Sequence, residues 1–327
     1  MFAQTRKLFA RSFPVISLWL GFSGATAQLP LHVHEPTPSG STYRVLLVGD
    51  SWTEFFWVNR SLRNVFSDQG HGDIWEKGDL TTLSGSTAAE WTEIQQLQTI
   101  ADELALNPSI DIIQVTLGGN DFLAGVQGNG WYVGITHEEE QAVIDRIISD
   151  IGIVIDYILN LNPEYKVLLS FYDFPNFEES LNGILSFSCE DLFNRMNQPT
   201  TLELNQAFGR FNASLKAQIA TFERVSLVDH VGLMQFQFGF PAMNIPPGSL
   251  LPPGDPNLPS PIQAMFLGAD CIHLNSVGYE GIAKNLWDSY YIHHFCVSDV
   301  SWEAAVEGWA FERDIRKLVD FSNRRCL

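Results

Sequence analysis

Short apolar runs alternate with helical segments along most of this chain of 327 residues. Four of the five runs are almost continuously apolar, as parallel strands are when helices cover both faces of their sheet. Two helical segments open on capping boxes, Thr87 to Glu90 and Thr136 to Glu139. The alternation predicts βαβ units, and so an α/β fold with a parallel sheet between layers of helices. Strands are expected at residues 43–48, 73–77, 110–117, 166–172 and 225–228, and helices at about residues 54–66, 87–106, 136–161, 202–222 and 277–291.

The first apolar run ends on the tripeptide Gly49-Asp50-Ser51. Open α/β sheets bind their ligands at the carboxyl ends of the strands, so a serine in this turn can be presented to a substrate. The same residues are ordinary in turns, because glycine tolerates unusual backbone angles and Asp and Ser bond to nearby backbone groups. The tripeptide alone therefore leaves a plain strand-to-helix turn open.

Three further polar blocks lie at strand ends or in loops beside them: Ser84-Gly85-Ser86, Gly118-Gly119-Asn120-Asp121 and Asp270-Cys271-Ile272-His273. A serine hydroxyl is a weak nucleophile unless a base takes its proton, and histidine is suited to that task. Asp270 can fold back onto the His273 ring and hold it in one tautomer. The oxyanion of acyl transfer needs preorganised donors, and the N–H of Gly85 and the amide of Asn120 would serve.

In this order the blocks resemble the SGNH (GDSL-type) hydrolases, over about residues 44–287. The resemblance implies that Ser51 is the nucleophile, His273 the base and Asp270 the orienting acid. It assigns the oxyanion hole to the N–H groups of Ser51 and Gly85 and the side chain of Asn120. It also implies a flavodoxin-like three-layer α/β/α sandwich with a parallel five-stranded sheet of strand order 2-1-3-4-5, and a carboxylic ester hydrolase activity. We expect neither a cofactor nor a metal ion.

The chain departs from the family pattern at several places. Trp52 stands where the family usually has a small or aliphatic residue, and Asn275 follows Leu274 where the family often has Pro-Asn. Residues 241–261 hold eight of the 16 prolines, too many for a regular element. This segment is either a surface insertion or a wall or lid of the pocket. The departures leave the catalytic groups in place and the substrate undetermined.

Aromatic residues beside the polar blocks are candidates for substrate contact, because an aromatic ring can stack on a sugar or hold an acyl chain. The possible substrate-binding residues are Trp52, Trp131 and Tyr132, with core packing as the alternative. Phe55 and Phe56 are expected to pack into the core from the first helix.

Other polar residues compete for the same roles. Asp229 and His230 adjoin each other after the fifth strand, but neighbours on an extended chain point to opposite faces and cannot easily bond. Asp173, after the fourth strand, is expected to serve in a turn rather than in the cleft. Surface or helix-end positions explain the remaining histidines, which have no partner motif: His32, His34, His71, His137, His293 and His294.

The N-terminus is typical of a signal peptide, with basic residues at positions 6, 7 and 11 before an apolar run at 13–22. Ala25-Thr26-Ala27 supplies a cleavage site, so we expect cleavage after Ala27 and a secreted or extracytoplasmic protein, an uncleaved anchor being the alternative. The expected organisation is a signal peptide (residues 1–27), a hydrolase domain (28–297) and a C-terminal helical extension (298–327).

The chain is strongly acidic. It has 38 acidic and 19 basic residues, a net charge of −19, and loss of residues 1–27 would remove three basic residues and leave a net charge of −22. Such a surface repels nucleic acid and anionic membranes, so neither nucleic acid binding nor stable membrane insertion is expected. The expected partner is a small-molecule or carbohydrate ester.

Four cysteines in an exported protein suit two disulfides, and three connectivities are open. We expect Cys189–Cys271, which would brace the loop of Asp270 and His273, and Cys296–Cys326. No pair has the spacing of zinc ligands. Asn59 and Asn212 begin glycosylation sequences, which matter only in a host that glycosylates exported proteins.

The sequence favours a secreted serine esterase that removes acyl or acetyl groups from carbohydrate or small soluble esters. A metal-dependent phosphoesterase is an alternative, because Asp50, Asn120, Asp121, Asp270 and His273 are all possible ligands. The clusters of bridging ligands expected of such enzymes are not found in the sequence. A non-catalytic carbohydrate-binding protein on the same fold is the other alternative.

Overall fold

The structure is a computed structural model that describes residues 39–125, 128–182 and 186–296. The signal peptide expected at residues 1–27 and the extension expected at residues 298–327 lie outside the described residues. Cys296 is disulfide-bonded, but its expected partner Cys326 also lies outside them.

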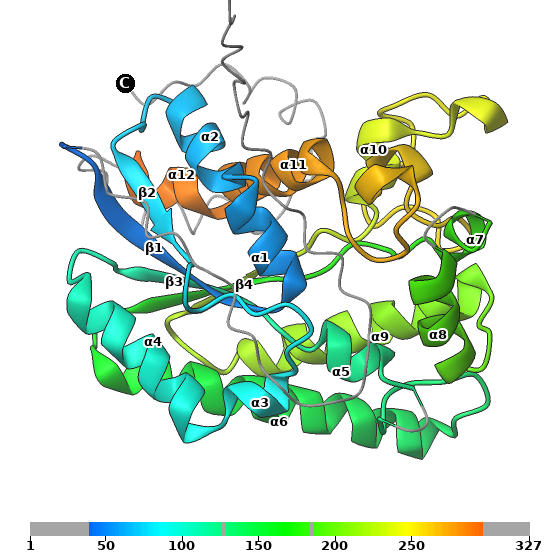
Figure 1. Cartoon of the computed structure of the whole chain (residues 1–327), viewed down its shortest axis with the longest axis horizontal. Helices are drawn as coiled ribbons and strands as arrows, with labels where there is room; N and C mark the ends of the chain where they lie inside the picture. The colour runs from blue at the N-terminus through cyan, green and yellow to red at the C-terminus, as the bar shows by residue number, and fades with distance from the viewer. Residues whose placement is uncertain (1–38, 126–127, 183–185, 297–327) are drawn as a thin grey trace, which may run out of the picture. The chain divides into compact units, whose positions relative to one another are not determined.

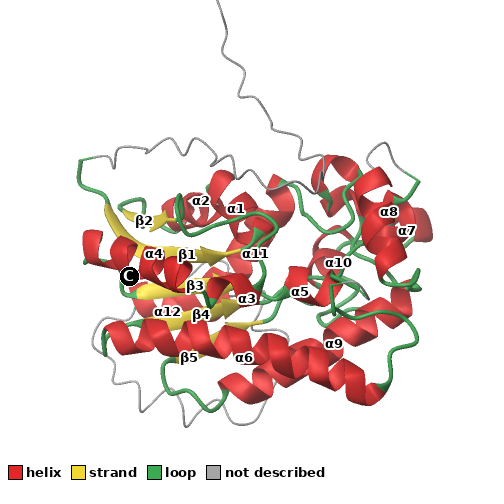
Figure 2. Ribbon diagram, turned by 60° about the horizontal axis from the view of Figure 1, so that its bottom comes forward, coloured by secondary structure: helices red, strands yellow, loops and turns green. Residues whose placement is uncertain are grey.

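Five parallel strands form one sheet in the order β2-β1-β3-β4-β5 (Figure 1, with all five strands labelled in Figure 2). This is the expected order 2-1-3-4-5. The winding of the sheet reverses at β1, which has β2 on one side and β3 on the other, and open α/β sheets bind ligands at such a switch point. The strands are β1 (Thr42–Gly49), β2 (Ile74–Lys77), β3 (Ile112–Thr116), β4 (Lys166–Ser170) and β5 (Val225–Val228).

Helices cover both faces of the sheet, which gives the expected three-layer sandwich. On one face lie α1 (Ser51–Val58), α2 (Ser61–Asp68), α11 (Ser276–Leu286) and α12 (Ile292–Phe295), and on the other α3 (Ala88–Trp91), α4 (Ile94–Leu106), α6 (His137–Leu161) and α9 (Thr201–Ile219) (Figure 1). Beyond the carboxyl ends of the strands lie α5 (Gly119–Leu123), α7 (Phe177–Ser180), α8 (Ser186–Arg195) and α10 (Leu233–Phe238) (Figure 2). A π-helical turn, Trp287–Tyr291, joins α11 to α12, and 3₁₀ turns lie at Pro241–Met243, Ile262–Ala264 and Phe266–Gly268.

The central strands are buried because both faces are covered. Val45, Leu46, Leu47 and Val48 of β1 are all 0% exposed. Burying an aliphatic side chain of this size stabilises a fold by about 1.5–3 kcal/mol. The run of four therefore fixes where β1 ends, and with it the position of the turn at Ser51.

Two of the expected helices are each two helices in the structure. The segment expected at residues 54–66 is α1 and α2, separated at Arg60, whose left-handed φ of 56° ends a helix. The segment expected at residues 87–106 is α3 and α4, separated at Thr92 and Glu93. The Thr92 hydroxyl bonds back to the Ala89 carbonyl, and Glu93 is extended. Apolar periodicity averages over a turn or more and does not detect such single-residue breaks.

Among the helix starts that the structure describes, three open on capping boxes. Those at Thr87 and Thr136 are the ones that the sequence predicts. A third, which was not predicted, pairs Thr200 with Glu203 at the start of α9. Each box satisfies two N–H groups that a helix start would otherwise leave without partners.

The proline-rich segment 241–261 is held by side-chain amides. Gln235 Nε2 donates hydrogen bonds to three carbonyl oxygens between residues 255 and 259. Asn205 Nδ2 donates to the Pro256 carbonyl and shares the Leu258 carbonyl with Gln235. Asn176 Nδ2 donates to the Ser260 carbonyl. These amides take the place of the regular backbone pairing that prolines prevent.

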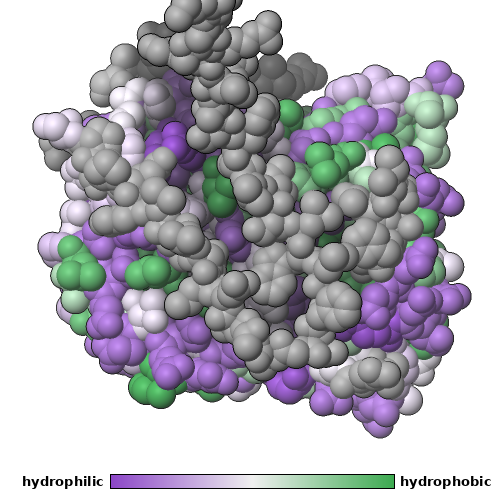
Figure 3. All heavy atoms as spheres, in the orientation of Figure 1, coloured by the Kyte–Doolittle hydropathy of each residue, from purple (hydrophilic) through white to green (hydrophobic). Residues whose placement is uncertain are grey.

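Hydrophilic side chains cover most of the described surface on the face shown in Figure 3, and hydrophobic ones form separate patches. Among the described residues, none of the helices combines the length and the apolar character that a membrane span requires.

Candidate active site

Ser51 is the first residue of α1, directly after β1. The Asp50 side chain caps this helix by accepting the Trp52 N–H over 2.9 Å. Glycine is required at position 49, because a Cβ there would lie 2.2 Å from the carbonyl oxygen of Thr116 in the neighbouring strand. The close strand pairing and the helix cap together fix the position of the Ser51 hydroxyl.

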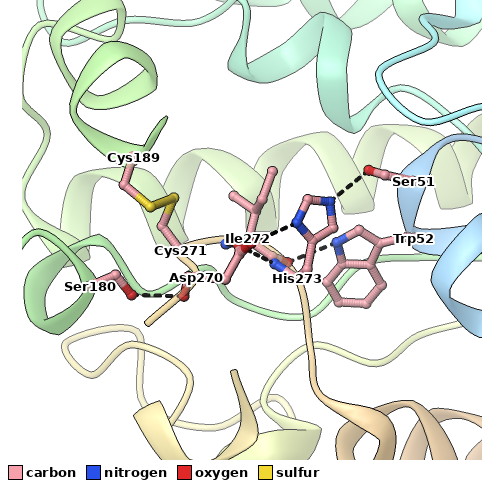
Figure 4. Close-up of polar contacts among 8 residues, drawn as sticks. All are labelled: Ser51, Trp52, Ser180, Cys189, Asp270, Cys271, Ile272 and His273. Atoms are coloured by element: carbon pink, nitrogen blue, oxygen red, sulfur yellow. Dashed lines mark hydrogen bonds and ion pairs between the residues drawn. A yellow bond between two sulfur atoms is a disulfide. The ribbon is translucent and has the colours of Figure 1, made fainter. Parts of the chain in front are cut away.

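Ser51, His273 and Asp270 meet in a continuous chain of hydrogen bonds (Figure 4). Nε2 of His273 lies 2.8 Å from Oγ of Ser51, and Nδ1 of His273 lies 3.0 Å from Oδ2 of Asp270. Ser51 is 6% exposed, and the side chains of His273 and Asp270 are 17% and 19% exposed. A hydroxyl bonded to an imidazole whose other nitrogen is held by a carboxylate is arranged for general-base activation.

Asp270 is held in its charged form. Burial alone would raise its pKa, but the adjacent His273 ring and the hydrogen bonds from His273 and Ile272 outweigh burial, so the pKa of Asp270 lies below its usual range. Oδ1 accepts the backbone N–H groups of Ile272 and His273, each over 2.8 Å. Oδ2 therefore remains for the His273 imidazole. The three-residue spacing between Asp270 and His273 allows this contact to form within one loop.

Figure 4 shows three of the contacts that hold the loop of Asp270 and His273. The disulfide Cys189–Cys271, the pair expected from the sequence, ties the loop to α8. The Ser180 hydroxyl donates to the Asp270 carbonyl over 2.7 Å. The indole Nε1 of Trp52 donates to the Ile272 carbonyl over 2.9 Å, which joins the loop to α1.

The loop of Gly85 and the turn of Asn120 are tied to each other and to α1. The Glu54 carboxylate of α1 accepts the Ser84 N–H over 2.9 Å, next to Gly85. Nδ2 of Asn120 donates to the Ser86 carbonyl over 2.9 Å, on the other side of Gly85. Three segments that are distant in sequence therefore meet at the start of α1.

Donors remain free in these turns. Within the described residues, the N–H groups of Ser51 and Gly85 have no hydrogen-bond partner, and Asn120 uses one of the two N–H bonds of its amide. Gly85 has a left-handed φ of 80°, which favours glycine. Asn120 lines the same pocket as Ser51, whereas Gly85 lies in an exposed turn outside the pocket lining.

A buried tyrosine joins the end of β1 to the end of β3. The Tyr172 hydroxyl donates to Oδ2 of Asp50 and accepts the Gly119 N–H over 3.0 Å. Burial raises the pKa of Asp50 to about 7, although the hydrogen bonds from Tyr172 and Trp52 act to lower it. Asp50 thus shapes the turn that presents Ser51, and Tyr172 couples that turn to the one carrying Asn120.

A pocket of about 340 Å³, part of it open to solvent, lies beside Ser51. Its apolar walls include Leu123, Pro175, Phe208 and Ile272. We call it the Ser51 pocket. Mostly apolar walls with a few polar groups are typical of ligand sites. Of residues 241–261, all within the described part of the chain, none contributes to its lining.

The three aromatic candidates for substrate contact lie in two different places. Trp52 lines the Ser51 pocket but is only 8% exposed, and it packs edge-on against Tyr172. Trp131 is 3% exposed and stacks on Phe122 with ring centroids 6.0 Å apart. Trp131 and Tyr132 line a second hollow, whose lining does not include Ser51.

Asp229 and His230 have separate partners, as the extended-chain geometry predicts. Nε2 of His230 lies 3.0 Å from the Ser170 hydroxyl, and Nδ1 lies 2.9 Å from Nδ2 of Asn285. Burial lowers the pKa of His230 to about 4, so this ring is a neutral core residue. Asp229 accepts a hydrogen bond from the side-chain amide of Asn212 over 2.8 Å. Asn212 begins one of the two glycosylation sequences, and in the structure its side chain is buried and engaged in this bond.

Asp173 has the turn role expected for it. Its carboxyl group accepts the N–H of the adjacent Phe174 and the N–H groups of Gly232 and Met234 at the start of α10, each over 2.7 Å. Burial raises its pKa to about 7. Asp173 also lines the Ser51 pocket, so it serves in the cleft as well as in the turn, although the turn alone is expected from the sequence.

Phe55 contacts the imidazole, which the sequence interpretation did not foresee. Its ring stacks on His273, with centroids 4.9 Å apart and an interplanar angle of 26°, and on Tyr279, at 6.1 Å and 11°. Phe55 follows Ser51 by four residues, so both lie on the same side of the helix. This four-residue spacing is the sequence feature from which a contact between Phe55 and the catalytic groups could have been predicted.

The side chains that a metal-dependent phosphoesterase would use have other partners. Asp121 accepts the Ala88 N–H over 2.7 Å, while Asp50 and Asp270 have the partners described above. Within the described part of the chain, no three His, Cys, Asp or Glu side chains form a group that could hold a metal ion.

Comparison with known proteins finds one family. A family model described as GDSL-like Lipase/Acylhydrolase matches residues 45–286. The match includes all five residues to which the sequence assigns a role in catalysis: Ser51, Gly85, Asn120, Asp270 and His273. No curated protein matches the chain.

Several solved structures resemble the chain at low identity. A lipase from a goat rumen metagenome is 16% identical over 77% of this chain and 98% of that chain, with a TM-score of 0.44. A carbohydrate esterase of family 3 from Talaromyces cellulolyticus is 16% identical over 79% and 100%, with a TM-score of 0.42. An inhibitor-bound aryl esterase from M. smegmatis is 14% identical over 76% and 99%, with a TM-score of 0.44. Likenesses at this level say nothing about the activity of this chain.

Proposed function

The chain belongs to the GDSL-like lipase/acylhydrolase family and is a carboxylic ester hydrolase, and from this premise we propose that it is a secreted serine esterase whose catalytic residues are Ser51, His273 and Asp270. One observation carries the proposal. A single chain of hydrogen bonds runs from the Ser51 hydroxyl through both nitrogens of His273 to the Asp270 carboxylate.

In the first half of the reaction, Oγ of Ser51 attacks the ester carbonyl carbon while Nε2 of His273 takes the hydroxyl proton. The tetrahedral intermediate collapses, the bond to the alcohol oxygen breaks, and the His273 imidazolium gives its proton to the leaving alcohol. In the second half, His273 takes a proton from water, and the resulting hydroxide attacks the acyl group on Ser51. The carboxylic acid leaves, and Oγ of Ser51 regains its proton from His273.

Asp270 holds the His273 ring so that Nε2 faces Ser51, and its charge stabilises the imidazolium that forms in each half of the reaction. The low pKa of Asp270 supports this role, because the carboxylate stays charged throughout the working range of a histidine base.

The developing oxyanion is bound by the N–H groups of Ser51 and Gly85 and by the side chain of Asn120. The free donors described above support this assignment. Loss of one such donor typically lowers kcat by about 10²–10³, so Asn120→Ala is expected to lose activity by that factor.

The proposed substrate is an acetyl or other short acyl ester of a carbohydrate or of a small soluble alcohol. The apolar walls of the Ser51 pocket suit a short uncharged acyl group. Asp50 and Asp173 line the same pocket, and once ionised, above about pH 7, they disfavour an acyl chain that carries a negative charge. The net charge of −19 also disfavours anionic polymers as substrates.

Secretion is part of the proposal and rests on the basic and apolar N-terminal pattern that ends at Ala27. Sequencing the N-terminus of secreted material tests it. A mature chain that begins at Gln28 is the expected result, and a retained segment 1–27 contradicts it.

The test of the activity is hydrolysis of p-nitrophenyl acetate by Ser51→Ala, with Ser109→Ala, an exposed serine at the opposite end of the sheet, as the matched control. The proposal expects Ser51→Ala to lose both hydrolysis and labelling by a fluorophosphonate probe, while Ser109→Ala keeps both. Hydrolysis that persists in pure Ser51→Ala protein overturns it. A parallel screen of acetylated glycans, short-chain esters and phospholipids identifies the preferred ester.

A further inference from the structure

The second hollow, which we call the Trp131 hollow, lies between the loop before α6 and the side of α9. It has a volume of about 430 Å³, part of it open to solvent. The loop contributes Tyr132, Val133 and Ile135 to its lining, and α9 contributes Gln206 and Arg210. The catalytic proposal uses none of these residues.

A buried carboxylate organises the floor of the Trp131 hollow. Glu140 of α6 accepts the indole N–H of Trp131 over 3.0 Å and a two-pronged contact from Nε and Nη2 of Arg210. Trp131 is fixed in turn by its stacking on Phe122. The guanidinium is therefore held in one plane at the hollow, and within the described residues its Nη1 has no partner.

Further hydrogen-bonding groups remain unused at the same place. The Tyr132 hydroxyl and the Gln206 side-chain amide, both lining the hollow, have no hydrogen-bond partner in the described part of the chain. Glu203 gives one carboxylate oxygen to Thr200 in its capping box, and its other oxygen has no partner among the described residues. Donors and acceptors therefore line the hollow together.

The charges of the Trp131 hollow narrow the class of ligand. Glu140 and Glu203 face one cation, Arg210, so the hollow keeps a negative charge within a chain of net charge −19. The negative charge of the hollow does not attract an anion such as phosphate. A cation would be repelled by the Arg210 guanidinium. Val133, Ile135 and the Tyr132 ring add apolar groups to a lining that is otherwise polar. A neutral ligand with several hydroxyl groups and an apolar face fits this combination.

We propose that the Trp131 hollow binds a neutral sugar ring, separately from the Ser51 pocket. The Tyr132 ring packs against the apolar face of the sugar, and Arg210, Gln206 and Glu203 bond its hydroxyl groups. If the proposed esterase function also holds, a glycan anchored here raises the local concentration of its own ester groups at Ser51. The binding itself does not depend on that function.

The binding test uses the full-length Ser51→Ala protein, which cannot consume an ester, and ester-free neutral oligosaccharides of xylose, glucose, mannose and N-acetylglucosamine in isothermal titration calorimetry. At least one is expected to bind. Adding Gln206→Ala or Tyr132→Ala should weaken binding by about 2- to 12-fold each, as loss of one contact does. Gln218→Ala, an exposed glutamine further along α9, is the matched control and should bind normally.

The proposal is overturned if none of the four oligosaccharides binds. It is also overturned if one binds and neither Gln206→Ala nor Tyr132→Ala weakens that binding, because the sugar would then bind elsewhere on the protein. Hydrolysis of p-nitrophenyl acetate by the active enzyme tests the esterase function separately from sugar binding, because this small ester needs only the Ser51 pocket. On an acetylated polysaccharide, the Gln206→Ala change in the active enzyme should raise KM and leave kcat near that of the parent.

Discussion

The indole N–H of Trp52 donates a hydrogen bond to the carbonyl oxygen of Ile272 over 2.9 Å. This contact joins two segments 220 residues apart in sequence, the helix that begins with Ser51 and the loop that carries His273. Trp52 is nearly buried between Tyr172 and Tyr279, so its ring has little freedom to move. Its role is to position the two halves of the site relative to each other.

Replacing Trp52 by Phe removes this hydrogen bond and keeps most of the ring packing. Because small displacements of a catalytic group are costly, up to about 10²-fold per ångström, we expect kcat for p-nitrophenyl acetate to fall about 10-fold with KM little changed. Trp75→Phe is the matched control, since it also loses an indole bond to a carbonyl but lies at the sheet edge. A rise in KM with normal kcat would instead assign Trp52 to substrate binding.

Tyr172 offers a second test, because its hydroxyl bridges Asp50 and the Gly119 N–H. Tyr172→Phe leaves a buried carboxyl and a buried N–H without this partner, which costs about 1–3 kcal/mol each. We expect a lower free energy of unfolding and, because Gly119 precedes Asn120, about a 10-fold lower kcat. Urea unfolding and steady-state kinetics measure the two effects, with Tyr165→Phe as a buried control outside the Ser51 pocket. Normal kcat in Tyr172→Phe would show that Asn120 keeps its place without this bridge.

Much of the fold follows from local patterns. Continuous apolar runs such as Val45 to Val48 predict buried strands because both faces of the sheet are covered. The strand order does not follow from alternation and came from the family resemblance. The helix breaks at Arg60 and Glu93 are not predicted from the sequence. Each break is a change of backbone conformation at one or two residues, within apolar spacing that otherwise fits a continuous helix.

The candidate site divides in the same way. Asp270 and His273 are three residues apart, so their contact can be expected from sequence. The contacts of Phe55 with His273 and of Tyr172 with Asp50 join distant segments, and only tertiary packing brings them together. Trp131 shows the reverse case. It is near Asn120 in sequence, but it packs on Phe122 and lines the Trp131 hollow and not the Ser51 pocket.

The raised pKa of Asp50 predicts a pH-dependent difference in stability. In the folded protein this carboxyl has a pKa of about 7, against about 3.9 in an unfolded chain. Between these values the folded state binds more protons, so Asp50 costs stability as pH rises from 4 to 7. Asp50→Asn lacks this cost, so its stability relative to the parent should increase from pH 5 to pH 8.

Melting temperatures of Asp50→Asn and its parent at pH 5 and pH 8 measure this change. Comparison with the parent cancels other groups, among them His230, whose lowered pKa of about 4 acts in the opposite direction. Asp68→Asn, an exposed aspartate of α2, is the control and should differ from the parent equally at both pH values. A constant difference for Asp50→Asn as well would mean that Asp50 is already ionised at pH 5.

The disulfide Cys189–Cys271 should act on both stability and catalysis, because Cys271 adjoins Asp270 and the bridge spans 82 residues of sequence. Removing both sulfurs with Cys189→Ala/Cys271→Ala should lower the free energy of unfolding by about 2–5 kcal/mol. The loop then keeps the Ser180 and Trp52 hydrogen bonds and its backbone bonds, such as the one from the Asn176 N–H to the Cys271 carbonyl, but loses its covalent tie to α8. We therefore expect kcat to fall while KM stays close to the parent value. Urea unfolding, and kinetics at a temperature where the variant is fully folded, separate the two effects.

Reducing agent is a poor substitute for the variant, because Cys296 is disulfide-bonded as well. Lower stability with an unchanged kcat would mean that the bridge stabilises the fold but that the remaining hydrogen bonds of the loop suffice to position His273.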